Sequence, residues 1–247
     1  MFQKTRGLVL RETEYKDNDK LLTLLTEDHG LMTVKARGVK KSKSLLKSAC
    51  QILTYSEFTV LERQGYHTIT EAEPIEMFSA LRTDLELLSL GSYFAQATEV
   101  LSQEDFPNPE LLRLTLYCLY ALCKGRTKMI VKAAFELRLA AFSGYAPDLS
   151  GCAACGSHTP AYFCVSDGSL LCADCRPPEP GALRLPVSAD SLAAMRYILS
   201  CEPARLCAFT LGESAAKELA DVSETYLLTQ LERGFYTLDF YKSLQIT

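Results

Sequence analysis

The sequence contains no long apolar run, few histidines and no glycine-rich phosphate loop. No stretch approaches the roughly 20 apolar residues of a membrane-spanning helix, and only Leu8, Val9 and Leu10 form an apolar segment before the first charged pair. We therefore expect neither a membrane anchor nor an export signal. Three histidines offer no Cys/His or Ser/His/Asp constellation, and no motif points to nucleotide binding. No catalytic constellation can be argued from these residues.

The chain also lacks an excess of positive charge. Lys and Arg number 26 against 30 Asp and Glu, which gives a net charge of −4 and a pI near 5.5. Such a molecule has no overall field that attracts nucleic acid, so any nucleic-acid site must be local. With 247 residues, 48% hydrophobic and 23% charged, the composition is that of a globular protein with one large domain or two small ones.

The N-terminal part, residues 1–76, has the pattern of a small β domain. Five short apolar segments are separated by turn residues and lie at 7–10, 21–25, 31–36, 53–61 and 66–72. Turns at Gly30 and Gly65 predict that the second and third segments, and the fourth and fifth, form hairpins. The alternation of the fourth segment breaks between Tyr55 and Phe58, which indicates a bulge. We expect a small closed sheet.

Residues 77–247 have helical periodicity, interrupted by an insert. We expect helices over about 81–101, from Asn108 and Pro109 to near Gly125, and over 128–142, 188–199 and 213–233. Between them, residues at about 148–180 are rich in Gly, Pro, Ser and Cys and show little periodicity. This insert must be held by something other than a hydrophobic core.

The insert carries two C-x-x-C pairs. Cys152 and Cys155 precede Cys172 and Cys175 by a separation that lets four thiolates bind one zinc ion tetrahedrally. Four cysteines leave no open position for water, so we expect a structural zinc rather than a catalytic one; unligated thiols are the alternative. The absence of an export signal agrees with a reducing cytosol, where paired cysteines indicate metal binding. The other six cysteines lack ligand spacing and are expected in the core: Cys50, Cys118, Cys123, Cys164, Cys201 and Cys207.

A basic stretch lies between residues 35 and 47, with six basic residues and no acid. Lys35 and Arg37 alternate with apolar residues along a strand, so we expect both to point into solvent. Lys40, Lys41 and Lys43 follow in a serine-containing loop. This arrangement suits phosphate contacts; a solvated turn kept polar for solubility is the alternative.

Two further groups of residues permit two interpretations each. Tyr55, Phe58 and Tyr66 could stack on bases or belong to the barrel core. A second basic cluster is either a solvated helix face or a site for an acidic peptide, and consists of Lys124, Arg126, Lys128, Lys132 and Arg138.

Several stretches resemble the RecO family of bacterial recombination mediators. They are residues 5–20, residues 30–39, the run from 135 to 149 and the two C-x-x-C pairs, and they cover nearly the whole chain in order. The resemblance implies an α+β multidomain fold. An N-terminal OB-fold β-barrel over 1–76 would precede an all-helical domain over 77–247, which carries a zinc ribbon inserted at about 148–180.

The resemblance also implies a function. Members of this family lack a catalytic centre, bind single- and double-stranded DNA, anneal complementary strands and work with RecR to load RecA onto DNA coated by the single-strand binding protein SSB. Lys35 and Arg37 match the basic strand positions of the family, and Lys40, Lys41 and Lys43 match its basic loop, so these five residues are the expected DNA contacts. The four paired cysteines match the zinc ligands of the family's ribbon. The acidic SSB tail has an apolar end, and the cluster from Arg126 to Arg138 is a candidate dock. The expected location is the cytoplasm, in association with the nucleoid.

Two other functions compete with this interpretation. The first is a zinc-ribbon adaptor whose basic loop binds an acidic protein and not DNA. The second is a nucleic-acid-modifying enzyme that uses the barrel for substrate delivery, although the sequence shows no cofactor pocket or acid/base pair for it.

Overall fold

The computed structural model describes residues 1–175 and 181–245. Packing divides the chain into two compact units: Met1–Cys123 together with the chain from Phe235 onward, and Lys124–Gly234. Residues 176–180, at the end of the expected insert, lie outside the described part of the chain. We predicted a domain boundary at residue 76 because the sequence changes there from strand periodicity to helix periodicity. The division by packing concerns a different property and does not test that boundary, which stays a prediction.

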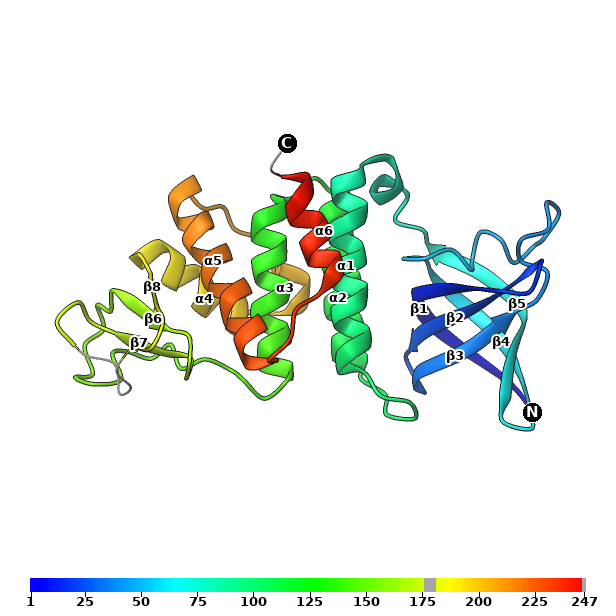
Figure 1. The fold of residues 1–247 in the computed structure, drawn as a ribbon, viewed down its shortest axis with the longest axis horizontal. Helices are drawn as coiled ribbons and strands as arrows, with labels where there is room; N and C mark the ends of the chain where they lie inside the picture. The colour runs from blue at the N-terminus through cyan, green and yellow to red at the C-terminus, as the bar shows by residue number, and fades with distance from the viewer. Residues whose placement is uncertain (176–180, 246–247) are drawn as a thin grey trace. The chain divides into compact units, whose positions relative to one another are not determined.

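The first unit contains a closed five-stranded barrel (Figure 1). Its strands are β1 (Phe2–Tyr15), β2 (Asp19–Thr26), β3 (Gly30–Ala36), β4 (Tyr55–Arg63) and β5 (Tyr66–Glu76). They pair in the order β1-β2-β3-β5-β4, and β4 also pairs with β1. The two predicted hairpins, β2–β3 and β4–β5, are confirmed, and a parallel pairing of β3 with β5 closes the sheet.

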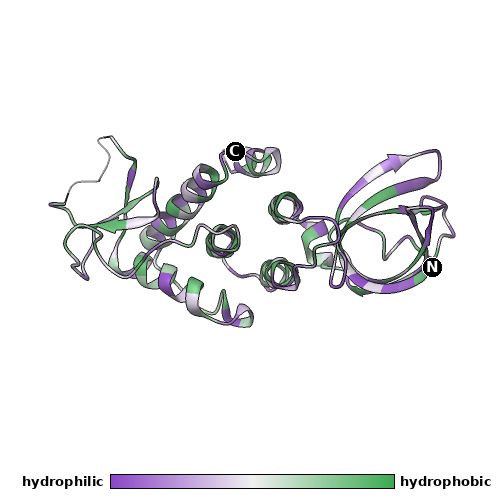
Figure 2. Cartoon of the chain, turned by 90° about the horizontal axis from the view of Figure 1, so that it is seen from below, coloured by the Kyte–Doolittle hydropathy of each residue, from purple (hydrophilic) through white to green (hydrophobic). Residues whose placement is uncertain are grey.

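The barrel is filled by the inward-facing residues of each strand. In β3, Met32, Val34 and Ala36 are buried while Thr33 is exposed, as the two-residue period of a strand requires. Figure 2 shows the same alternation of hydrophobic and hydrophilic residues along the strands. Phe58 is fully buried in this core. The register shifts between β4 and β5, at Tyr55/Ser56 and Thr59/Val60, leave the extra residues, Ile75 and Thr70, in β5. The predicted bulge in the fourth strand is therefore wrong, because β4 alternates regularly between buried and half-buried residues and keeps an unbroken register with β1.

Three helices complete the first unit: α1 (Leu85–Leu101), α2 (Pro109–Cys123) and α6 (Tyr236–Leu244), with a short 3₁₀ turn, η1 (Ser79–Thr83). The predicted cap of α2 is present, since Asn108 Oδ1 accepts the Leu111 N–H at 3.0 Å. The sequence analysis did not predict α6. It lies beside α1 (Figure 1), where the ring of Phe235 meets that of Tyr93 edge-on at 5.5 Å.

The barrel and the helices of the first unit meet at a tight contact. Leu31 N–H donates to the Gln103 carbonyl at 2.9 Å. Gly30 has φ +65°, and a Cβ there would lie 2.5 Å from the carbonyl oxygens of Gln103 and Phe106. Only glycine combines a positive φ with the absence of a Cβ. This turn therefore fixes the barrel against the connection between α1 and α2.

The second unit contains three helices and a small sheet. The helices are α3 (Lys128–Phe142), α4 (Ala189–Ser200) and α5 (Glu213–Gln230), with a 3₁₀ turn η2 (Pro203–Arg205). The sheet pairs β7 (Ser169–Leu171), β6 (Tyr162–Cys164) and β8 (Arg184–Pro186), in that order. Tyr226 of α5 packs edge-on against Phe163 of β6, with ring centroids 5.1 Å apart. The four-cysteine insert therefore rests on α5.

The predicted fold class is confirmed in its main parts. An OB-like barrel of five strands precedes a helical region, and the insert carries a cluster of cysteines that could form a zinc site. Among the described residues, no helix is both long enough and apolar enough to span a membrane.

Candidate nucleic-acid interface and metal site

Strand β3 and the turn that follows it place two cations, Lys35 and Arg37, at the end of the barrel in different environments. Arg37 is exposed as expected, whereas the Lys35 side chain is only 20% exposed. Its ammonium lies 3.1 Å from a carboxylate oxygen of Asp19 and 4.7 Å from the centroid of the Tyr15 ring. The expectation that both side chains point into solvent is therefore wrong for Lys35, because the neighbouring strands supply an anion and an aromatic face.

Asp19 also fixes the start of the basic loop. Its carboxylate accepts the Gly38 N–H at 2.8 Å, and Gly38 has φ +63°, a conformation that favours glycine. The Gly38 N–H, together with the Lys35 ammonium, lowers the pKa of Asp19 below its usual value. Asp19 is thus a fixed anion that joins the β1–β2 turn to the chain leaving β3.

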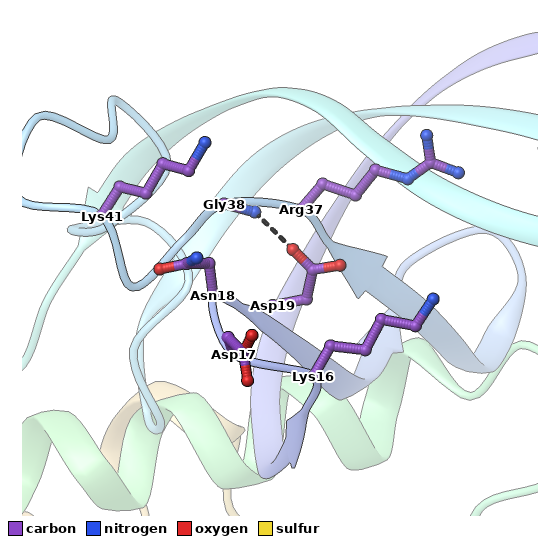
Figure 3. Close-up of a pocket in the computed structure, with 7 residues that line it drawn as sticks. All are labelled: Lys16, Asp17, Asn18, Asp19, Arg37, Gly38 and Lys41. Carbon is purple, nitrogen blue, oxygen red and sulfur yellow. Dashed lines mark hydrogen bonds between the residues drawn. The ribbon is translucent and has the colours of Figure 1, made fainter.

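A shallow pocket of about 410 Å³ lies around this contact (Figure 3). Its lining consists of the β1–β2 turn and the start of the loop: Lys16, Asp17, Asn18, Asp19, Arg37, Gly38 and Lys41. Figure 3 shows Lys16 and Arg37 extending to the same side, with Lys41 on the other side of Gly38. Three cations therefore surround a pocket that also presents acids.

Lys16 is the cation of this pocket that sequence reasoning missed. It occupies the β1–β2 turn with φ +56° and is exposed. A single lysine in a turn with two aspartates carries no charge signal. Only its position within the 5–20 stretch could have drawn attention to it.

The loop after Gly38 presents the remaining predicted cations. Lys40 forms an exposed ion pair with Glu14 of β1. Lys41 and Lys43 are exposed, and in the described part of the chain neither they nor Arg37 forms an ion pair. Leu46 packs against the barrel core and anchors the loop. Of the five predicted contacts, two are held by carboxylates and three are open to a phosphate.

The four paired cysteines come together as predicted. The sulfurs of Cys152, Cys155, Cys172 and Cys175 all lie within 4.8 Å of one another, and those of Cys155 and Cys172 are 3.6 Å apart. Tetrahedral zinc with Zn–S bonds of about 2.3 Å requires sulfurs about 3.8 Å apart. The cluster therefore has the donor set and nearly the spacing of a four-thiolate metal site.

Backbone groups prepare this cluster for a cation. Desolvation raises the pKa of the Cys152 thiol, but the backbone N–H groups of Cys172, Cys155 and Ala154 outweigh it and lower the pKa to about 6. By contrast, hydrogen bonds with Cys155 and Cys152 raise the pKa of Cys175 to about 12. A bound metal ion would replace the thiol protons.

The second basic cluster does not form one exposed surface. Lys132 is 5% exposed, and its ammonium lies 2.8 Å from Glu136 and 2.7 Å from Glu224. Arg138 is partly buried and donates to the Cys201 carbonyl. The hypothesis of a dock running from Arg126 to Arg138 is therefore wrong, because two of its members are committed to bonds within the second unit.

The chain thus combines an OB-like barrel with a basic rim, a helical region and a four-cysteine ribbon, and comparison with known proteins places it in a class of DNA repair proteins. The family model described as Recombination protein O N terminal matches residues 1–78, and the model described as Recombination protein O C terminal matches 82–239. The chain therefore belongs to the RecO family.

Individual relatives span almost the same length. The chain is 32% identical to "DNA repair protein RecO" of Acetivibrio thermocellus, over 98% of this chain and 97% of the relative. A protein of the same description from Dehalococcoides mccartyi strain CBDB1 is 31% identical, over 98% and 96% of the two chains. Another from Bacillus pumilus is 30% identical, over 92% and 88%.

Proposed function

We propose that the protein is a recombination mediator that binds single- and double-stranded DNA and anneals complementary strands. The observation that carries this proposal is the local concentration of cations around the β3 end of the barrel in an otherwise acidic chain. Arg37, Lys41 and Lys43 are the primary phosphate contacts. Lys35 and Lys40 contribute when a phosphate competes with Asp19 and Glu14.

Annealing needs no catalytic centre. A positive surface neutralises the repulsion between two phosphate backbones and leaves the base edges open for pairing. The two strands then pair by their own hydrogen bonds and stacking. Membership in a DNA repair family supports this non-enzymatic role.

We infer the partners from the resemblance to this family. With RecR, the protein would help to load RecA onto single-stranded DNA coated by SSB, and the acidic tail of SSB would bind it directly. This work takes place in the cytoplasm, at the nucleoid. The four-cysteine cluster would hold one structural zinc ion, which would fix the ribbon on α5 and take no part in the DNA chemistry.

A salt series tests DNA binding. We would measure the affinity of the full chain for a labelled single-stranded oligonucleotide in wild type, in the Arg37→Ala/Lys41→Ala variant and in the control Arg63→Ala/Lys217→Ala. The control removes the same two residue types from exposed positions elsewhere. Each phosphate contact to a single strand contributes about −0.7 to the slope of log K against log salt, so the first variant should flatten the slope by about 1.4.

The zinc-ribbon adaptor is the alternative function. It predicts no salt-dependent binding of DNA at low ionic strength, and equal behaviour of both double variants. In that case the basic loop serves an acidic protein, and binding of RecR would be measured next.

A further inference from the structure

Helix α2 has two different faces. One is buried in the first unit and consists of Leu111, Leu112, Leu114, Thr115, Cys118, Leu119 and Leu122. The other carries Arg113, Leu116, Tyr117 and Tyr120, spaced like one face of a helix. Tyr117 is 39% exposed and Tyr120 is 49% exposed. Two tyrosines and an arginine on one outer face are more than solubility requires.

This outer face forms one wall of a pocket of about 350 Å³. The barrel end of the same unit supplies the other wall with Tyr55, Glu76 and Phe78. Phe78 is 4% exposed and forms the floor. The pocket thus combines four aromatic rings with one guanidinium and one carboxylate.

Both polar groups of the barrel wall are held in place. The Glu76 carboxylate accepts the Phe78 N–H at 3.0 Å with Oε1, and Tyr55 donates its hydroxyl hydrogen to Glu27 in the turn between β2 and β3. Because Tyr55 is tied at its hydroxyl, its ring presents a fixed aromatic surface to the pocket. Within the described part of the chain, the second carboxylate oxygen of Glu76 has no hydrogen-bond partner and can accept one.

We propose that this pocket takes one unpaired nucleobase of single-stranded DNA, an inference that rests on the proposed function. Planar bases stack on aromatic rings irrespective of sequence, since every base has a π face. Tyr117 and Tyr120 supply that stacking surface, Arg113 neutralises the adjoining phosphate, and Glu76 accepts a base N–H. A volume of about 350 Å³ suits a single planar group and is too small for a run of peptide side chains.

The pocket gives the protein a preference that the basic loop alone does not provide. Phosphates are present on both single strands and duplexes, whereas a base can enter the pocket only when it is unpaired. The protein should therefore hold a single strand by the pocket and by its phosphates. It should release the base when the complementary strand pairs with it.

An abasic strand separates the two kinds of contact. We would compare the affinity of the full chain for oligothymidylate and for an abasic oligonucleotide of equal length, which keeps the phosphates and lacks the bases. Wild type should prefer oligothymidylate, and Tyr117→Ala and Tyr120→Ala should each lower its affinity for that strand by about five-fold to 100-fold. Their affinity for the abasic strand should not change.

Two conservative changes sharpen the result. Tyr120→Phe keeps the ring and should retain the preference for bases. Tyr236→Ala removes a tyrosine of the same unit that is 70% exposed and lies outside the pocket, so it should also retain the preference. Circular dichroism of each variant verifies that the chain is folded.

Three outcomes overturn the proposal. The first is equal wild-type affinity for both strands. The second is an equal loss in Tyr236→Ala and Tyr120→Ala. For the third, binding of an acidic aromatic peptide is measured in parallel. The proposal fails if Tyr117→Ala and Tyr120→Ala lose binding of this peptide but retain binding of oligothymidylate. Failure of the proposed function looks different, since wild type would then bind neither strand.

Discussion

The ammonium of Lys35 lies 3.1 Å from the carboxylate of Asp19, and the two residues join the basic strand to the turn between β1 and β2. A phosphate oxygen that approaches Lys35 must compete with this carboxylate. The ion pair therefore limits how much of the positive charge of β3 is available to a ligand.

Replacing Asp19 should increase DNA affinity. In Asp19→Asn the amide oxygen still accepts the Gly38 N–H, but Lys35 loses its anion and gains a phosphate contact. The salt slope for a single strand should then steepen by about 0.7. Asp17→Asn is the control, because it removes the same charge from an exposed neighbouring position. Equal effects of the two changes would show that DNA affinity depends on the net charge of this region and not on the release of Lys35.

Removing one ribbon cysteine should remove the metal. We expect one zinc per chain in wild type by mass spectrometric metal analysis, and a large loss in Cys155→Ser together with a lower melting temperature, because metal binding stabilises the folded ribbon. Cys207→Ser changes a half-buried cysteine outside the cluster and should retain the zinc. Zinc content that is the same in Cys155→Ser and wild type would contradict the four-thiolate site.

Lys132→Met should destabilise the second unit strongly. The change leaves Glu136, which is fully buried, and Glu224 without their cation. Breaking a buried pair from one side costs about 3–5 kcal/mol, which urea unfolding can measure. Lys132→Met/Glu136→Leu should recover most of this loss, since it removes both charges of the buried pair. If the double variant is no more stable than the single one, the lost charge pair is not the cause.

Glu136 should give the second unit a distinct pH dependence. Complete burial raises the pKa of Glu136 above its usual value near 4.5, against the opposing effect of Lys132. The folded state therefore binds this proton more tightly than the unfolded state, and protonation of Glu136 stabilises the fold as the pH falls from the raised pKa toward 4.5. We would follow the difference in melting temperature between wild type and Glu136→Gln across that range. It should grow in favour of wild type on acidification; a difference that shrinks would mean that Lys132 keeps Glu136 ionised.

Phe235→Ala should destabilise the first unit by about 3–5 kcal/mol, the usual cost of truncating a buried aromatic residue. Phe235 is 1% exposed and packs on Tyr93. Since the chain has no tryptophan, far-ultraviolet circular dichroism in denaturant is the suitable measurement. Tyr236→Ala, at a position that is 70% exposed, should cost little. Similar losses in both variants would contradict the packing of α6 on α1.

Local signals explain which parts of the fold the sequence could predict. Turn glycines and alternating residues predicted the two hairpins, and Asn108 predicted the start of α2. The parallel pairing of β3 with β5 joins segments more than 30 residues apart, and no local pattern encodes it. Helix α6 has nine residues and few buried positions, so its periodicity was too short to recognise.

The site shows the same division. The spacing of the four cysteines is a local property, and it predicted the cluster in full. The state of a basic residue depends on distant partners: Lys132 meets Glu224 from another helix, and Lys35 meets Asp19 from another strand. Composition places these charges in the right region, but only the fold shows which of them are already paired.

The chain leaves the first unit at Cys123 and returns to it at Phe235. During synthesis, the surface of α1 that α6 later covers stays exposed until residues 124–234 have been made. At bacterial elongation rates of about 5–20 residues per second, that wait lasts roughly 5–20 s. Throughout this interval the ribosome carries a nascent chain with an uncovered apolar helix, so the yield of native protein should depend on chaperones that shield it.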